Sequence, residues 1–288
     1  MKVAIAGSSG YIGSALADSL AARLEGCEVI RIGRRENVDI SLDLNRTDEF
    51  DFNKLVGIDY VIFTAAISGP DKCANDIEEC REVNVTGTGN FIAQALNRGC
   101  RVLFFSSDAV YAGGTEQIYD ENSILEPRTP YGQMKKEIET RFQGQQGFKA
   151  VRLSYVISAR DKFFSYLLGC RERHSEAELF HPYYRNVIML DEVLQSVSWL
   201  LENWKNFEPQ ALCLAGAELV SRLRLADELN GLGGERIVYH LVIPDEVFFQ
   251  NRPRVAQMRS CYLYEYGILP RKTFTERFQA QFRGRIDE

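Results

Sequence analysis

The sequence has no long hydrophobic run and no excess of basic residues. Among its 288 residues, no apolar stretch approaches the roughly 18 residues that a helix needs to span a bilayer. The apolar run at the N-terminus ends at Gly7, short of the ~7 residues of a signal-peptide core. We therefore expect neither a membrane segment nor a secretory signal. The net charge of −6 argues against a general nucleic-acid binder, whose surface would be basic.

Metal-binding patterns of cysteine and histidine are also missing. The seven cysteines form no CxxC pair, and no histidine near them has the spacing of a metal ligand. The histidines, His174, His181 and His240, have neither ligand spacing nor a nucleophile beside them. An odd, scattered set of cysteines is typical of free buried thiols in a reducing compartment. We expect a cytoplasmic protein without a structural metal.

The first half of the sequence alternates short apolar runs with helical patterns. Strands are expected at Lys2–Ala6, Glu28–Ile32, Tyr60–Thr64, Arg101–Ser106 and Phe148–Leu153. Helices are expected at Tyr11–Leu24, Asn75–Arg98 and Thr129–Gln143, the last with Thr129 as N-cap and Pro130 in the first turn. This alternation predicts an α/β fold with a doubly wound parallel sheet.

The second half is less regular. Helical patterns occur at Lys162–Arg173, Asp191–Asn203, Ser221–Leu229 and Phe274–Phe282. We expect a dinucleotide-binding domain over residues 1–154 and a smaller, mixed substrate-binding region over residues 155–288. Two segments of that region, Arg185–Met189 and Ala211–Ala215, are expected to return to the main sheet.

A glycine loop follows the first predicted strand and opens the first predicted helix. In this context Gly7 lets the chain turn sharply, Gly10 leaves room for a pyrophosphate, and Gly13 lets the helix approach the strand. Backbone N–H groups at the helix start would then face the phosphates. The spacing is GxxGxxG rather than GxGxxG, and an ordinary glycine-rich turn is the alternative. The cofactor contacts expected here are Gly7, Ser9, Gly10, Tyr11, Ile12 and Gly13.

The end of the second strand selects between the two nicotinamide cofactors. An acidic residue there would bind a ribose 2′-OH, whereas an arginine would pair with a 2′-phosphate. The sequence has Arg34 and Arg35 at this point and no carboxylate until Glu36. NADPH is therefore favoured, with Arg34 the main candidate and Arg35 the second, and NAD remains possible. Both arginines being solvated surface residues is the alternative.

Two further strand ends are weaker candidates for cofactor contact. Asp43 and Leu44 could border the adenine. Ala65 and Ala66, after the third long strand, are small enough to let the backbone approach a ribose.

A hydroxyl, a phenol and an amine form the candidate catalytic set. Ser107 lies just past a predicted strand, where ligands bind in a parallel sheet. Tyr131 and Lys135 are four residues apart near a helix start and so share a face. Reduction of a ketone needs a proton for the developing alkoxide, which Tyr131 would donate. Lys135 is expected to lower the phenol pKa, and Ser107 to donate a hydrogen bond to the oxyanion.

These motifs resemble the extended short-chain dehydrogenase/reductase superfamily. The resemblance is carried by Gly7–Gly13, Asn84–Thr88, Phe105–Tyr111, Tyr131–Lys135, Val151–Val156 and Arg185–Ile188. Within it the sequence is most similar to dTDP-4-dehydrorhamnose reductases, through Ser106–Tyr111, Leu214–Leu225 and Arg252-Pro253. The resemblance implies a Rossmann-type domain, an NAD(P)H cofactor contacted by Asn84 among others, a hold of Lys135 on the nicotinamide ribose, and reduction of the 4-keto group of a nucleotide-linked 6-deoxysugar.

The sequence departs from that family at places that bear on the substrate. Ser107 replaces the usual threonine, and 161–184 and the last forty or so residues match poorly. Asp108-Ala109 lacks the second acid of the dehydratases, so dehydration is not expected. A nucleotide-sugar epimerase that uses NAD stays open, as does a non-catalytic NADP-binding regulatory subunit.

Substrate contacts are expected from a few dispersed residues. Ser107, Asp108 and Tyr155 are candidate substrate contacts; Tyr155 would face the sugar, with a core tyrosine as the alternative. Arg185, Arg222, Arg252 and Arg254 are candidates for a diphosphate, with Arg222 and Arg252 chosen as contacts, and a surface or structural arginine is the alternative for each. The 109–128 loop lies between the predicted catalytic residues in sequence, so we interpret it as a wall or lid over the substrate, with a flexible insertion as the alternative. A homodimer is possible.

Overall fold

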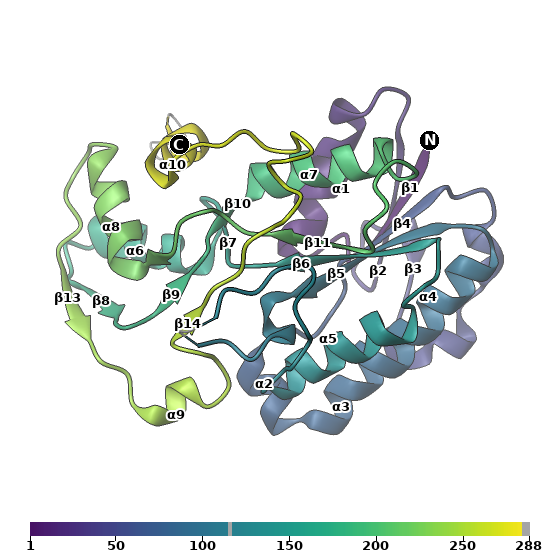
Figure 1. Ribbon diagram of the computed structural model, residues 1–288, viewed down its shortest axis with the longest axis horizontal. Coiled ribbons are helices and arrows are strands. Elements are labelled where there is room, and N and C mark those ends of the chain that lie inside the picture. Colours follow the sequence, from purple (N-terminus) through teal and green to yellow (C-terminus); the bar gives the residue numbers. More distant parts are fainter. Residues whose placement is uncertain (115–116, 284–288) are drawn as a thin grey trace. The chain divides into compact units, whose positions relative to one another are not determined.

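The computed structural model of the protein describes residues 1–114 and 117–283 (Figure 1). Residues 115–116 of the predicted lid and residues 284–288 of the predicted substrate-binding region lie outside the described residues. Contacts divide the chain into two compact units. The first unit comprises Met1–Tyr111, Ile124–Arg152 and Leu194–Leu212; the second comprises Ala112–Ser123, Leu153–Val193 and the chain from Cys213 onward.

A mostly parallel sheet of seven strands runs in the order β11-β6-β5-β4-β1-β2-β3. Its strands are β1 (Lys2–Ala6), β2 (Glu28–Gly33), β3 (Ile40–Ser41), β4 (Tyr60–Phe63), β5 (Arg101–Ser107), β6 (Phe148–Leu153) and β11 (Ala211–Leu214). Strand β1 pairs in parallel with both β2 and β4, so the strand order reverses between β1 and β4. Such a switch point is where open α/β sheets bind ligands, outside the carboxyl ends of the strands.

Helices cover both faces of this sheet (Figure 1). Helix α1 (Tyr11–Arg23) and the portion of α7 (Leu190–Glu202) that belongs to the first unit lie on one face. The other face carries α2 (Pro70–Asn75), α3 (Ile77–Arg81), α4 (Thr88–Asn97) and α5 (Pro130–Arg141). Short 3-10 turns are η1 (Leu44–Glu49), η2 (Phe52–Leu55) and η4 (Asp108–Val110). The α/β class and the doubly wound sheet are thus confirmed.

The helix expected at Asn75–Arg98 is wrong as one continuous element. Helix α2 begins earlier, at Pro70, and Asp76 interrupts the helix with φ −123° and ψ 59°. A π-helical segment, η3 (Glu82–Gly87), then joins α3 to α4. At its end Gly87 lies so close to η1 that a Cβ there would be 1.9 Å from the Leu44 carbonyl oxygen. Single π turns often occur at functional sites.

One large core cluster of the first unit lies between the sheet and helices α4 and α5. Alternate residues of β1 and β4 face it, for example Ala4, Val61 and Phe63, all fully buried. The ring of Phe91 in α4 packs against that of Phe63 in a tilted arrangement, with 5.6 Å between ring centroids. A smaller cluster beside α5 joins Cys73, Cys80, Val85 and Met134 to the partly buried Ile67 and Tyr131. This cluster fixes the start of α5, where the candidate catalytic residues lie.

The second unit is built from short strands and helices. Its strands are β7 (Val156–Ile157), β8 (Ala177–Phe180), β9 (Tyr184–Arg185), β10 (Ile188–Met189), β12 (Val220–Ser221), β13 (Tyr239–Val242) and β14 (Val255–Ala256). Its helices are α6 (Lys162–Glu172), α8 (Arg222–Gly231), α9 (Glu246–Phe249) and α10 (Phe274–Phe282). The core includes Phe164, stacked on Phe282 at 4.5 Å.

The two segments expected to return to the main sheet have different outcomes. Ala211–Ala215 is confirmed, because β11 forms the edge of the seven-stranded sheet next to β6. Arg185–Met189 is wrong, because β9 pairs with β12 and β14, and β10 pairs with β7, in two separate small sheets. The backbone groups of these residues pair with short strands of the second unit instead.

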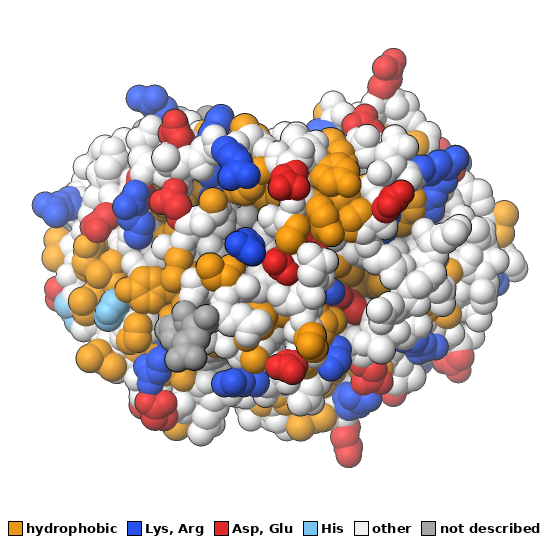
Figure 2. Space-filling view, in the orientation of Figure 1, with side chains coloured by type: hydrophobic (Ala, Val, Ile, Leu, Met, Phe, Trp, Pro, Cys, Tyr) orange, Lys and Arg blue, Asp and Glu red, His pale blue; other side chains and the backbone are white. Residues whose placement is uncertain are grey.

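The contact division does not follow a single cut near residue 154. Residues 112–123 belong to the second unit and 194–212 to the first. Five of the seven cysteines are buried. None of the described helices combines the length and apolar character that a membrane-crossing helix requires. On the face drawn in Figure 2, basic and acidic side chains of the described residues are interspersed, and neither sign forms a broad area.

Candidate functional site

The glycine loop lies at the switch point of the sheet, directly after β1. Gly7 has φ +90°, a conformation that side-chain-bearing residues rarely adopt, and a Cβ there would be 2.6 Å from the Ala65 backbone nitrogen. A Cβ on Gly13 would be 2.2 Å from the Gly7 carbonyl oxygen. These two glycines therefore let β1, α1 and the residues after β4 approach one another, as the spacing predicts.

Gly10 has a different environment. It is the N-cap of α1, and a Cβ built on it would meet just the Gly7 carbonyl oxygen, at 3.3 Å. No side chain caps the helix, and no acidic residue lies in its first turn. An uncapped helix start with room in front of it fits a phosphate, because its N–H groups and dipole favour an anion. The loop thus fits the pyrophosphate of a dinucleotide.

The end of β2 lies beside this loop. A Cβ on Gly33 would be within 4.0 Å of the Ser8 and Ser9 hydroxyl oxygens. Arg34 and Arg35 follow at once, and both are exposed. By contrast Arg31 is engaged by Asp18, with 2.8 Å between guanidinium nitrogen and carboxylate oxygen. The two candidate arginines are therefore next to the loop and free of such an ion pair.

The residues after β3 are largely occupied within the fold. Asp43 caps η1 by accepting a hydrogen bond from the Asn45 backbone at 3.0 Å, and Leu44 is buried in the core. Their contact with an adenine stays a prediction.

The Asn84 side chain binds the backbone of the segment after β4. The Asn84 side chain accepts from the Ile67 backbone N–H and donates to the Ile67 carbonyl oxygen, each at 2.9 Å. Asn84 is buried, so the structure gives it a clear role in fixing the segment that contains Ala65 and Ala66. Direct contact of Asn84 with a cofactor stays a prediction.

Ser107 ends β5 and begins η4. Its hydroxyl donates to the Asp108 carboxylate at 3.1 Å and accepts from the Ala109 backbone at 3.2 Å. The side chain is half-buried, whereas the preceding residues of β5 are buried. The hydroxyl therefore lies at the carboxyl edge of the sheet, where the sequence predicts it, and Asp108 lies beside it.

Tyr131 and Lys135 lie in the first turns of α5. Thr129 caps this helix by accepting from the Gly132 backbone, and Pro130 occupies the first turn, as predicted. The Lys135 amine lies 5.7 Å from the centre of the Tyr131 ring. It donates to the Phe105 carbonyl oxygen at 2.7 Å, which ties α5 to the end of β5. The predicted phenol, amine and hydroxyl are thus carried by one helix and the adjoining strand end.

The expected lowering of the Tyr131 pKa is wrong for this structure. Burial raises that pKa, and the nearby Cys73 and Asp108 raise it further. Burial also lowers the pKa of Lys135 to about 8. Lys135 does not lower the Tyr131 pKa because its amine donates to the Phe105 carbonyl oxygen and not to the phenol. Tyr131 is therefore protonated at neutral pH, the state that a proton donor needs.

A buried polar network behind these residues was missed by the sequence analysis. Glu139 of α5 accepts from the Arg152 guanidinium at 2.8 and 3.0 Å and from the Ser106 hydroxyl. Arg152 also donates to the Tyr111 hydroxyl at 2.8 Å. The signal available in the sequence is the position of Glu139, four residues after Lys135 on the same helix face.

In the second unit, Tyr155 is engaged by an acidic side chain. Its hydroxyl donates to the Asp161 carboxylate at 2.8 Å, and burial raises the Tyr155 pKa. The same carboxylate caps α6 through the Phe163 and Phe164 N–H groups. Burial raises the Asp161 pKa, while these hydrogen bonds oppose the shift.

Arginines of the second unit gather on aromatic rings. The Arg222 guanidinium lies 4.7 to 5.1 Å from the ring centres of Phe163, Tyr183 and Phe180. Arg252 lies over Phe248 at 4.4 Å and donates to its carbonyl oxygen. These contacts orient both guanidinium groups.

The other two arginine candidates have structural partners. Arg185 is buried and donates to the Pro253 and Tyr184 carbonyl oxygens, so it joins β9 to the chain near β14. Arg254 pairs with Glu246.

Most of the described part of the predicted lid is anchored in the second unit. The Gly114 N–H donates to Val255, and Tyr119 bridges to Met258. The Glu121 carboxylate accepts from the Cys213 and Cys261 backbone N–H groups, each at 2.8 Å. These bonds do not fit the flexible insertion that was the alternative, and the role as wall or lid stays a prediction.

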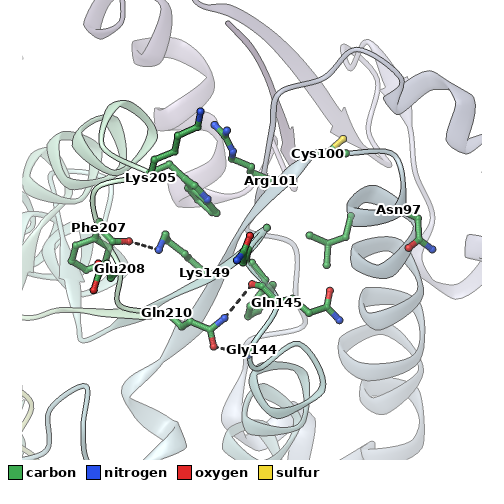
Figure 3. A pocket seen from close by; sticks show the side chains of 16 residues that line it. Asn97, Cys100, Arg101, Gly144, Gln145, Lys149, Lys205, Phe207, Glu208 and Gln210 are labelled. Atoms are coloured by element: carbon green, nitrogen blue, oxygen red, sulfur yellow. Dashed lines mark hydrogen bonds between the residues drawn. The ribbon is translucent and has the colours of Figure 1, made fainter.

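A cavity of about 950 Å³ opens at the opposite end of the sheet (Figure 3). It is lined by the beginnings of β5 and β6, and Lys149 donates there to the Phe207 and Pro209 carbonyl oxygens at 2.5 and 2.9 Å. Gln210 bridges Gly144 and Gln145 beside it. This cavity lies outside the amino ends of the strands, so it is separate from the glycine loop. Among the described residues, no group of three or more His, Cys, Asp or Glu side chains is arranged to hold a metal ion.

Comparison with known proteins supplies relatives of two kinds. The chain is 28% identical over 167 residues to a probable low-salt glycan biosynthesis reductase of Haloferax volcanii, a match that covers 56% of this chain and 55% of the relative. The chain spans about half the length of the curated relatives that it matches.

Solved structures match over almost the whole chain. A dTDP-4-dehydrorhamnose reductase from Clostridium acetobutylicum has a TM-score of 0.82 at 21% identity, covering 98% of both chains. The Bacillus anthracis dTDP-4-dehydrorhamnose reductase, solved in complex with NADP, has a TM-score of 0.83 at 17% identity, again covering 98% of both. At these identities the likeness shows the fold.

A family model decides the classification. It matches residues 3–196, which include the glycine loop, Ser107, Tyr131 and Lys135. This range is more than half of the chain. The chain belongs to the NAD dependent epimerase/dehydratase family.

Proposed function

We propose that the protein is an NADPH-dependent reductase of a nucleotide-linked 4-keto-6-deoxysugar, similar in activity to the dTDP-4-dehydrorhamnose reductases. The observation that carries this proposal is the set of Ser107, Tyr131 and Lys135 at the carboxyl edge of the sheet that also bears the glycine loop. Family membership and the fold likeness to such reductases support it.

A nicotinamide cofactor fits the first unit. The uncapped start of α1 would take the pyrophosphate, and the small residues Ala65 and Ala66 would border a ribose. Arg34 and Arg35 are exposed beside the loop, where a 2′-phosphate would need a cation, and this supports NADPH over NADH. When bound, the cofactor supplies the hydride that reduces the ketone.

The side chains at the edge of the sheet would manage the charge that reduction creates. Tyr131, protonated at neutral pH, would donate its proton to the carbonyl oxygen as negative charge develops there. The Ser107 hydroxyl would donate a hydrogen bond to the same oxygen. Lys135, fixed on the Phe105 carbonyl, would supply positive charge beside the phenol and hold the nicotinamide ribose.

The second unit offers groups suited to a nucleoside diphosphate. Arg222 and Arg252 carry the positive charge, and their contacts with Tyr183 and Phe248 hold the guanidinium groups in place. Tyr155, tied to Asp161, would contact the sugar.

An epimerase is the second candidate, because the family to which the chain belongs includes such enzymes. Epimerisation by redox chemistry begins with oxidation, for which the tyrosine must first accept a proton. A Tyr131 pKa raised by burial is unfavourable for that step, which supports reduction instead.

The test is to incubate purified protein with dTDP-4-dehydro-6-deoxysugars and NADPH and to follow both the cofactor and the sugar. Net loss of NADPH with formation of a reduced sugar is the expected result. An isomerised sugar without net cofactor loss, together with tightly retained NAD, would identify the epimerase instead. Cofactor binding without turnover of any keto-sugar would contradict catalysis and point to a regulatory subunit.

A further inference from the structure

The inward face of α5 carries a buried ion pair in addition to the candidate catalytic residues. Tyr131, Lys135 and Glu139 are spaced four residues apart and so lie along one face of the helix. Lys135, Glu139 and Arg152 are each less than 10% exposed. The Glu139 carboxylate is held from two sides, by Arg152 of β6 and by the Ser106 hydroxyl of β5.

The end of β5 is therefore fastened to α5 at two consecutive residues. The Phe105 carbonyl oxygen accepts from Lys135, and the Ser106 hydroxyl donates to Glu139. The next residue is Ser107, the candidate donor to the substrate oxygen. A shift of this strand end by one residue would turn Ser107 away, since successive side chains of a strand point to opposite faces.

We propose that Glu139 is a positioning residue of this site, which holds the Ser107 strand end against α5 and supplies the negative charge that keeps the Lys135 amine protonated. Arg152 fixes the Glu139 carboxylate in place and compensates its burial. The inference rests on the proposed function for its catalytic meaning, but the effect on Lys135 belongs to the free protein.

The charged surroundings of Lys135 support this role. Burial lowers its pKa, while Glu139, and after it Cys73 of α2, raise it. Cys80 of α3 raises the pKa of Cys73, and Asp108 of η4 raises the pKa of Tyr131. Arg152 of β6 forms an ion pair with Glu139. Glu139 is thus the main described group that favours the charged form of Lys135.

A purely structural ion pair is the competing explanation, since buried pairs often contribute little beyond their own burial. The two explanations differ in what happens to Lys135. A structural pair leaves its titration unchanged when the charge of Glu139 is removed. A positioning residue that supplies charge makes Lys135 lose its proton at lower pH.

The experiment is a titration of the lysine side chains by ¹³C NMR in cofactor-free protein, with Glu139→Gln compared with the unmodified sequence. Glutamine keeps the shape and can still accept from Arg152, so the charge is the main change. Lys135 is assigned by the signal that disappears in Lys135→Arg. We expect its midpoint to fall in Glu139→Gln and to stay near the original value in Glu139→Asp.

Lys149 serves as an internal control within the same unit. It is also buried, and burial alone lowers its pKa to about 8; it donates to the Phe207 and Pro209 carbonyls, and no carboxylate contributes to its shift. Its midpoint should not move. An unchanged Lys135 midpoint, or equal movement of both lysines, would overturn the proposal. If Glu139→Gln does not fold, Glu139→Gln combined with Arg152→Met removes both buried charges, and the same fall is expected.

The catalytic consequence is measured separately. The alkaline limb of the pH profile of kcat/KM should move to lower pH in Glu139→Gln. At pH values above this limb, kcat/KM should then be about tenfold lower for each pH unit by which the limb moves. Ser106→Ala removes a hydrogen bond without removing charge, so it should lower kcat without moving the limb. A limb that stays in place in Glu139→Gln overturns the proposal. Inactivity of the unmodified protein on every keto-sugar would reject the proposed function, while the NMR titration would still decide the role of Glu139.

Discussion

Two buried lysines lie at opposite ends of the central sheet and differ in what surrounds them. Lys135 lies at the carboxyl ends of the strands and Lys149 at the amino end of β6. Both are less than 10% exposed, both donate to backbone carbonyl oxygens, and burial lowers the pKa of each to about 8. The two lysines therefore have nearly the same pKa for the same main reason, burial.

Their neighbours separate them. Lys135 has a phenol, a carboxylate and a serine-bearing strand end around it. Lys149 has the aromatic rings of Trp204 and Phe207, at 5.4 and 5.2 Å, and two carbonyls. A shifted lysine pKa therefore marks burial, and reactive neighbours at the ligand-binding edge are needed before it marks a site.

The largest effect that tests this contrast is expected from Tyr131→Phe. Loss of the phenol removes the proton donor, and we expect turnover to fall roughly 100- to 10,000-fold while NADPH still binds. Turnover is followed by NADPH consumption and binding by fluorescence titration. Retained turnover in a variant that binds NADPH normally would mean that the carboxyl edge has no more chemistry than the amino edge.

The direct comparison is Lys135→Met against Lys149→Met. We expect Lys135→Met to lower kcat by about 100-fold, because the amine beside Tyr131 is lost. Lys149→Met should keep the kcat of the unmodified protein per folded molecule. Steady-state kinetics on samples corrected for folded fraction measure both. Equal losses in the two variants would break the contrast.

A smaller effect is expected at the end of β2. Arg34→Ala should weaken the preference for NADPH over NADH by roughly 10- to 100-fold, since a hydrogen-bonded charge pair contributes about 1.5–3 kcal/mol. The ratio of kcat/KM for the two cofactors is the measurement. Arg101→Ala is the matched control, because Arg101 lies at the amino end of β5 and donates to Tyr60. A ratio unchanged by Arg34→Ala would remove this arginine from the cofactor site.

The parts of the site that the sequence predicts are those that follow from local spacing. The glycine loop after an apolar strand, and Tyr131 and Lys135 at i and i+4, need no long-range information. Ser107 follows from its place after β5, because parallel strands bring their carboxyl ends to one edge. The confirmed β11 likewise is a short apolar run, which Gln210 precedes and Gly216 ends.

The parts that the sequence does not predict depend on partners that are distant in sequence, on backbone conformation, or on the direction in which a side chain donates its hydrogen bond. Glu139 pairs with Arg152, which lies on the next strand, and a glutamate on a helix is ordinarily solvated. The break at Asp76 is a backbone conformation inside a helical pattern. The predicted lowering of the Tyr131 pKa was wrong because the residue spacing gives the helix face on which Lys135 lies but not the group to which its amine donates.

A last effect is expected on stability and not on activity, and here the two lysines should behave alike. For Lys149 the pKa is about 8 in the folded state against 10.5 for an ordinary lysine, so the unfolded state binds more protons between these values. Stability contributed by this group therefore rises as pH increases through that window, and below about pH 8 the full cost of burying the charge is present. The free energy of unfolding of the unmodified protein, minus that of Lys149→Met, should rise by about 3 kcal/mol across the window. Urea unfolding at several pH values measures this difference, and subtracting the variant cancels the titration of other groups. Lys135→Met should give the same sign, since burial is the main cause of both shifts. A rise for Lys149 with none for Lys135 would mean that Glu139 offsets the burial of Lys135 in full, and the two ends of the sheet would then differ in electrostatics as well as in chemistry.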